Sequence, residues 1–295
     1  MTKSFSEKYG ALIYIFALIL FVTIIVAFTV DAHRDDVFSF TDESEETEEE
    51  NMCNVGVISL AGDINTMSTF ENVDSFTIAE GIRDLVGQEG HVAVVILIDS
   101  FGGTTAAAEE ISNAVEEISV PNVTFVRGAA LSGAYWIAST TDYIVSLSTS
   151  IIGSIGVTSS YFEQTAFNKK EGLEYHEIVS GTFKEVGNAN KPLAEEQRDY
   201  LQQHVDGAFD IFANVVKANR TLSDDQLARV SDGKFYLAAQ AKEYGLIDEV
   251  GGMREVKNYL ASQTELSAEE LSLCEPEDFY YDEEFDEDAE EEFDI

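Results

Sequence analysis

Residues 92–98 (VAVVILI) form an unbroken run of apolar, mostly β-branched residues. A strand that is apolar at every position is usually buried on both faces, as in parallel sheets that are covered by helices. Gly102–Gly103 follow and permit a sharp turn, and residues 104–118 have the pattern of a helix. This segment therefore predicts an α/β domain with a mostly parallel sheet and flanking helices.

The chain between residues 53 and 262 continues this alternation, and we assign it to one domain. Residues 147–156 are expected to form a loop, and no internal repeat is evident. Further strands are expected at 55–60, 123–126 and 143–146, and further helices at 75–87, 132–139, 194–218, 224–230 and 236–244.

A serine and a lysine stand out as candidates for chemistry. Ser132 lies among small residues in RGAALSGAYW, and Lys184 follows in SGTFKEVGNAN. A serine hydroxyl attacks a carbonyl only when a base takes its proton, and a lysine can be that base when burial lowers its pKa. Among the four histidines, His176 is the one alternative base. Three other lysines are expected to be ordinary surface residues: Lys169, Lys170 and Lys191.

Five motifs in residues 53–260 resemble, in order and spacing, those of the signal peptide peptidase A family, which are serine–lysine proteases with a ClpP/crotonase-like fold. The motifs are SFGGTTAAAEEI, GAALSGAYWIAS, STSIIGSIGV, GTFKEVGNANKPLAEEQRDYLQ and DGKFYLAAQAKEYGLIDEVGG. The resemblance implies that Ser132 is the nucleophile, that Lys184 is the general base, and that Ser154 orients the lysine. It implies no cofactor and no metal.

The same resemblance implies an oxyanion hole built from backbone N–H groups. Gly133 would supply one group, and the turn at Gly102–Gly103 the other. Phe101 stands where the family usually has proline, which changes the backbone preference of this turn. The choice between Gly102 and Gly103 therefore stays open.

Residues 11–30 form an apolar run without a charge, long enough to cross a bilayer as a helix. A cleaved signal peptide is the alternative, but the run is long for one and no A-x-A-like site follows it. Lys3 precedes the run and Asp31 follows it, so the positive-inside rule places residues 1–10 in the cytoplasm. We expect an uncleaved single-pass anchor with the catalytic domain outside the cell.

The net charge of −39 is concentrated in two segments, an acidic linker at 31–52 and an acidic tail at 263–295. Nine acids lie in 35–50 and sixteen in 265–295, with no lysine or arginine in either stretch. Such composition is typical of disorder, and the acidity suits a protein of a halophilic archaeon. It disfavours nucleic acid as a partner. The aromatic residues of the tail leave open that it docks onto a partner, although solvation is the simpler interpretation.

Cys53 and Cys274 flank the predicted domain. Two unrelated thiols are the simpler interpretation, and a disulfide between them is the alternative. Two N-x-[ST] tripeptides, at Asn122 and Asn219, are possible glycosylation sites on an external domain.

The favoured function is a membrane-anchored serine endopeptidase that cleaves hydrophobic peptides, such as remnant signal peptides or membrane-protein segments. Family members with one catalytic unit form homo-oligomeric rings whose sites can draw residues from neighbouring subunits, so a ring is implied by the resemblance. A catalytically silent peptide-binding scaffold of the same fold is the alternative. A crotonase-type acyl-CoA enzyme is disfavoured because acyl-CoA is cytoplasmic.

Overall fold

The computed structural model describes residues 53–67, 74–87 and 90–274. They belong to the second of two compact units into which the chain divides, Met52–Ile295. The predicted anchor, the acidic linker up to residue 52 and the tail beyond residue 274 lie outside the described residues. Among the helices of the described part, none is both long and apolar enough to span a bilayer.

A seven-stranded sheet forms the centre of the described domain, in the order β1-β2-β3-β4-β7 with β5 paired to both β3 and β6. All its pairings are parallel except that between β5 and β6. The strands are β1 (Val55–Ile64), β2 (Ala93–Gly103), β3 (Asn122–Leu131), β4 (Tyr143–Ser146), β5 (Ile151–Gly153), β6 (Phe235–Leu237) and β7 (Glu249–Val250).

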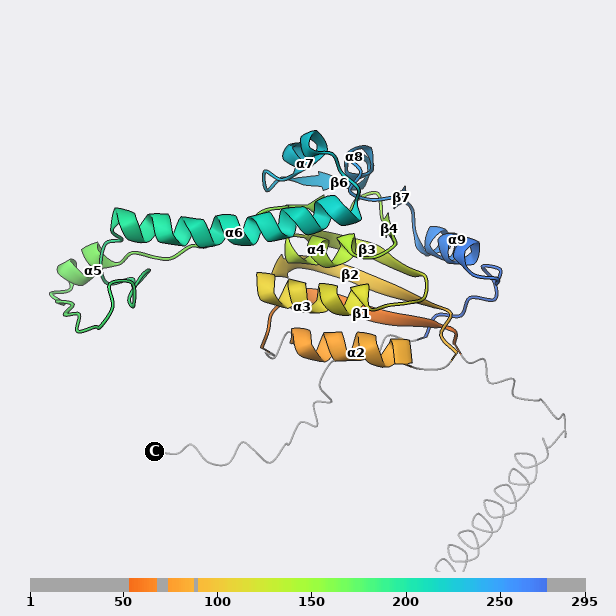
Figure 1. Ribbon diagram of the computed structural model, residues 1–295, viewed down its shortest axis with the longest axis horizontal. Coiled ribbons are helices and arrows are strands. Elements are labelled where there is room, and N and C mark those ends of the chain that lie inside the picture. The colour runs from red at the N-terminus through yellow and green to blue at the C-terminus, as the bar shows by residue number, and fades with distance from the viewer. Residues whose placement is uncertain (1–52, 68–73, 88–89, 275–295) are drawn as a thin grey trace, which may run out of the picture. The chain divides into compact units, whose positions relative to one another are not determined.

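Helices cover both faces of this sheet, as Figure 1 shows. The helices α2, α3 and α4 lie side by side on one face and enclose the larger apolar core, whereas α9 packs against β3 and β4 over a second core. The helices are α2 (Ser75–Gly87), α3 (Thr105–Glu116), α4 (Gly133–Ser139), α5 (Thr165–Lys170), α6 (Glu195–Asn219), α7 (Asp224–Val230), α8 (Ala238–Glu243) and α9 (Met253–Gln263). A mostly parallel sheet with flanking helices confirms the predicted α/β class and fits a ClpP/crotonase-like fold.

Two predictions differ from the structure, the end of the strand at 123–126 and the loop at 147–156. The strand predicted at 123–126 continues to Leu131, and the loop contains β5. The two errors have one cause, since Ala129–Leu131 pair with Ile151–Gly153 and each segment makes the other extended. Neither segment has an alternating or β-branched pattern long enough to predict a strand by itself.

The C-terminal part of α6 is fixed to the domain by a partly buried ion pair. Arg220, which caps α6, donates two hydrogen bonds to the carboxylate of Asp248, at 2.9 and 2.8 Å. The second oxygen of Asp248 also accepts the backbone N–H of Ile144, at the start of β4. On α4, the hydroxyl of Tyr135 donates to the backbone carbonyl of Leu246, and burial raises the pKa of this phenol. These bonds hold α4 and the end of α6 in place relative to the sheet.

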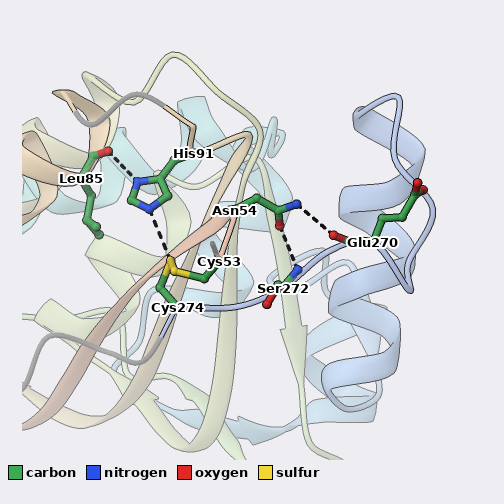
Figure 2. Close-up of a disulfide and its surroundings, with 7 residues drawn as sticks. All are labelled: Cys53, Asn54, Leu85, His91, Glu270, Ser272 and Cys274. Carbon is green, nitrogen blue, oxygen red and sulfur yellow. Dashed lines mark hydrogen bonds between the residues drawn. A yellow bond between two sulfur atoms is a disulfide. The ribbon is translucent and has the colours of Figure 1, made fainter. Parts of the chain in front are cut away.

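Cys53 and Cys274 form a disulfide, with 4.9 Å between their Cα atoms (Figure 2). The interpretation of two unrelated thiols is therefore wrong. The folded domain brings its first and last segments together, which the sequence does not reveal because 221 positions separate the two cysteines. The Nε2 atom of His91 lies 3.3 Å from the sulfur of Cys274, and its Nδ1 atom lies 3.0 Å from the carbonyl oxygen of Leu85.

The segment that ends at Cys274 pairs with the start of β1. Leu273 forms a parallel bridge to Val55, and the side chain of Asn54 bonds the backbone of Glu270 and Ser272 (Figure 2). The domain thus extends beyond residue 262, the boundary that composition indicated.

The two N-x-[ST] tripeptides lie in different surroundings. Asn122 is buried, and its side chain bonds Asp142 N–H and the carbonyl of Val120. Asn219 is exposed at the last position of α6. Of the two, only Asn219 is accessible in the folded domain.

Candidate active site

Ser132 lies at the junction of β3 and α4, in a strained backbone conformation. It caps the N-terminus of α4 with φ and ψ of 52° and −124°. Its N–H donates to the carbonyl of Gly153 at 2.8 Å, and its carbonyl accepts from Trp136 N–H. Because backbone on both sides holds this residue, the hydroxyl is presented at a fixed place in front of the helix.

Ser154 shares this strain. Among the described residues, the non-glycine positions with positive φ are Ser132, Ser154 and Thr221. Such conformations cost free energy and persist where the surrounding structure imposes them, often at functional sites. Ser154 is held by its N–H, which donates to Lys234 O at 2.8 Å. Two of the three strained positions are thus the two serines that the motifs identify.

Both serines line one cavity of about 580 Å³. Its wall is formed by the turn after β2, the start of α4, the segment after β5, and one side chain of α6. The lining residues are Gly103, Thr104, Thr105, Ser132, Gly133, Trp136, Ser154, Gly156, Val157, Thr158, Phe212 and Gly233.

Of the three glycines predicted to form the oxyanion hole, two line the cavity and one does not. Gly133 and Gly103 both line the cavity, and a Cβ atom built on Gly133 would lie 3.5 Å from the nitrogen of Gly103. Gly133 is the first residue of α4, where a backbone N–H has no acceptor within the helix. Gly102 is buried, and its N–H donates to the side chain of Ser100 at 3.0 Å. The geometry therefore favours Gly103 over Gly102 as the second donor.

The cavity has an aromatic wall that the sequence motifs do not indicate. Trp136 and Phe212 stack with ring centroids 5.1 Å apart and planes 7° from parallel. Phe212 belongs to the apolar stripe of the long helix, so its burial could be predicted, but its meeting with Trp136 could not. The wall gives the cavity an apolar surface beside the two serines.

Lys184 does not line this cavity. It lies exposed in the segment before α6, and its amino group has no bonded partner among the described residues. We refer to residues 158–200, which include α5 and the start of α6, as the arm. No residue from 156 to 211 is buried. Within one chain the structure brings together Ser132, Ser154, Gly103 and Gly133, and leaves Lys184 on the arm.

The alternative bases also lie outside the cavity lining. His176 is exposed beside Glu174, with its Nε2 atom 3.7 Å from the carboxylate. Lys191 is paired with Glu177 at 2.5 Å, and Lys169 and Lys170 end α5. None of these side chains lines the cavity, so none of them replaces Lys184 as the base within a single copy.

A strained serine between a strand and a helix, with backbone N–H groups beside it and a cavity in front, is the arrangement of a serine hydrolase. The comparison with protein families gives the particular class. The model of Peptidase family S49 matches residues 114–267, and the chain belongs to this family.

Three of the curated relatives carry names of proteases or peptidases. The chain is 32% identical over 192 residues to the putative protease MJ0651 of Methanocaldococcus jannaschii, covering 64% of this chain and 62% of that protein. It is 33% identical over 210 residues to Protease 4 of Haemophilus influenzae, covering 69% of this chain and 34% of that protein. The putative signal peptide peptidase SppA of Enterococcus faecium is 26% identical over 215 residues, 72% of this chain and 62% of the relative. The chain thus spans about a third to two thirds of these three relatives.

Proposed function

We propose that this protein is a membrane-anchored serine endopeptidase in which Ser132 attacks the peptide carbonyl and Lys184 of a neighbouring copy is the general base. The observation that carries the proposal is the strained Ser132, which lines a cavity together with Gly103, Gly133 and Ser154. Membership of a peptidase family supports the reaction class.

The chemistry follows from these positions. The Ser132 oxygen bonds to the carbonyl carbon while the neutral Lys184 amine takes its proton. The N–H groups of Gly103 and Gly133 stabilise the oxyanion, and removing one such donor typically costs about 10²–10³ in rate. Lys184 then protonates the leaving amine as the C–N bond breaks. Water, deprotonated by the same amine, releases the acyl group from Ser132.

A second copy is the proposed source of the base because the arm is unburied. Nine of its side chains and their neighbours on α6 are large, apolar and exposed, among them Phe162 at 92% and Ile178 at 98%: Tyr161, Phe162, Phe167, Leu173, Tyr175, Ile178, Val179, Tyr200 and Ile211. An apolar surface of this kind is typical of a protein interface. In a homo-oligomeric ring the arm of one copy would cover the cavity of the next and bring Lys184 to Ser132, away from bulk water.

The proposed substrates are hydrophobic peptides, such as remnant signal peptides, because Trp136, Phe212 and Val157 give the cavity an apolar wall. The anchor at 11–30 would hold the site near the membrane. A disulfide is typical of oxidising compartments, so the Cys53–Cys274 bond supports the proposed location outside the cell.

The experiment uses the full chain in detergent, a quenched hydrophobic peptide, and a fluorophosphonate label for active serines. Ser132→Ala and Lys184→Ala should each abolish cleavage, whereas the matched lysine variant Lys170→Ala should cleave within about twofold of wild type. Undiminished cleavage by either of the first two variants would refute the assigned role.

One observation favours the silent scaffold as a second candidate: among the described residues of a single chain, no lysine or histidine lines the cavity. The same assay separates the two functions. A wild-type protein that binds the peptide but neither cleaves it nor reacts with the label would be a scaffold.

A further inference from the structure

A third serine, which does not line the cavity, lies next to the Gly102–Gly103 turn. Ser100 is 1% exposed and belongs to β2. Its hydroxyl donates to the carbonyl of Gly62 at 2.6 Å and accepts the N–H of Gly102 at 3.0 Å. One side chain thus bonds the buried N–H of Gly102 on β2 and the carbonyl of Gly62 on the adjacent strand β1.

The sheet is irregular on both sides of Ser100, so ordinary ladder hydrogen bonds do not fix the backbone there. The register between β1 and β2 shifts between Ala61 and Asp63, at Gly62, whose φ is +75°. The register between β2 and β3 shifts between Ile98 and Ser100. Where the hydrogen-bond ladder between strands is interrupted, side chains must bond the backbone N–H and C=O groups that the neighbouring strand does not pair.

The turn that Ser100 holds lies directly against the nucleophile. Gly102 has a φ of +102°, and a Cβ atom on it would lie 2.9 Å from the Cβ of Ser132 and 2.7 Å from the carbonyl oxygen of Leu131. The bond to Ser100 turns the Gly102 N–H into the protein, while the next residue, Gly103, is exposed on the cavity. The orientation of the Gly102 N–H therefore sets the position of the Gly103 N–H.

We propose that Ser100 is a positioning residue for the oxyanion hole: its hydroxyl fixes the Gly102–Gly103 turn so that Gly103, with Gly133, faces the developing oxyanion. Ser100 touches no substrate. This inference rests on the proposed peptidase function and adds a residue to it. Without the hydroxyl, the Gly102 N–H and the Gly62 carbonyl both lose their buried partner, and the turn relaxes toward other partners.

The test compares Ser100→Ala with Thr141→Val in the full chain. Thr141 is also buried, and its hydroxyl oxygen lies 2.8 Å from Ala138 O, 3.0 Å from Thr124 Oγ1 and 3.2 Å from Tyr143 O. It lies beyond the other end of α4 from Ser132, so Thr141→Val removes a comparable buried hydroxyl without touching the cavity wall.

Two inhibitors of one peptide sequence report on the oxyanion hole separately from peptide binding. A peptide boronic acid forms a tetrahedral adduct with Ser132, whereas the corresponding peptide acid only occupies the cavity. Ser100→Ala should weaken the boronic acid, and lower kcat, by about 10- to 100-fold, with the peptide acid and KM within about twofold. Thr141→Val should change each of these values by less than about twofold.

Equal weakening of both inhibitors, or values for Ser100→Ala that match those of Thr141→Val, would overturn the positioning role and leave the peptidase function intact. A wild-type protein that neither cleaves peptides nor binds the boronic acid more tightly than Ser132→Ala does would overturn the peptidase function, and the role of Ser100 with it.

Discussion

The nucleophile region and the arm contrast in how they are held. Ser132 and Ser154 are fixed by hydrogen bonds to neighbouring strands and turns, and the residues around them are buried. The arm, which carries Lys184, has no buried residue in a single chain. The first region is complete in one copy, and the second has an apolar surface without a partner among the described residues. We infer that the two halves of the proposed catalytic pair depend on different levels of structure, the tertiary fold and the assembly of copies.

The largest expected effect comes from mixing two inactive variants. Ser132→Ala and Lys184→Ala should each be inactive alone. If Ser132 of one copy works with Lys184 of the next, a 1:1 mixture that has exchanged subunits should regain about a quarter of the wild-type rate, since about one site in four has both groups. The rate of peptide cleavage by the two co-expressed variants measures this recovery. A mixture that stays inactive would place both residues in the same copy.

The next effect contrasts two glycines with positive φ. At Gly102, an added Cβ would lie 2.7 Å from Leu131 O and would push against Ser132, so Gly102→Ala should lower kcat by about 100-fold or more. At Gly172, on the arm, φ is +72° and nothing lies within 4 Å of an added Cβ. Gly172→Ala should cost about 1 kcal/mol from backbone strain alone and keep most of the activity. Similar kinetics for the two variants would contradict the contrast.

Two aromatic side chains, one beside the nucleophile and one on the arm, should differ in their contribution to the free energy of unfolding. Trp136 is 3% exposed and stacked on Phe212, so Trp136→Ala should lower the free energy of unfolding by about 3–5 kcal/mol. Phe162 is 92% exposed, and Phe162→Ala should leave the stability of the single domain within about 0.5 kcal/mol. Chemical denaturation measures both variants. Size-exclusion chromatography with light scattering should show that Phe162→Ala weakens the assembly of copies, and an unchanged assembly would remove this residue from the proposed interface.

The smallest effect on catalysis is expected from the disulfide. Cys53 lies just before the first residue of β1, and Ile64, the last residue of this strand, contacts Gly103. The length of the strand therefore separates the disulfide from the oxyanion turn by about 30 Å. The double variant Cys53→Ser, Cys274→Ser should lose about 2–4 kcal/mol of stability and keep kcat within about twofold. Chemical denaturation with and without a reductant measures the loss of stability. The reductant should not change the stability of the double variant, which has no Cys53–Cys274 bond to reduce.

The sequence predicts those parts of the site that depend on local pattern. The apolar run at 92–98 and the small residues around Ser132 placed the sheet, the turn and the nucleophile helix correctly, because burial and glycine conformations act over a few residues. The sequence does not decide whether Gly102 or Gly103 donates the second N–H of the oxyanion hole, since this depends on Ser100 and on the bulge at Gly62. The disulfide could not be predicted from spacing. The role of Lys184 depends on assembly, which no local pattern encodes.

The bond between Cys53 and Cys274 turns the described domain into a covalent circle. A single cut in the backbone anywhere between these two cysteines, the arm included, opens the circle without separating the fragments. A protease that nicked its own arm would therefore keep its full mass on a gel run without reductant. Self-cleavage of this protein would become visible only after the sulfur bond is reduced.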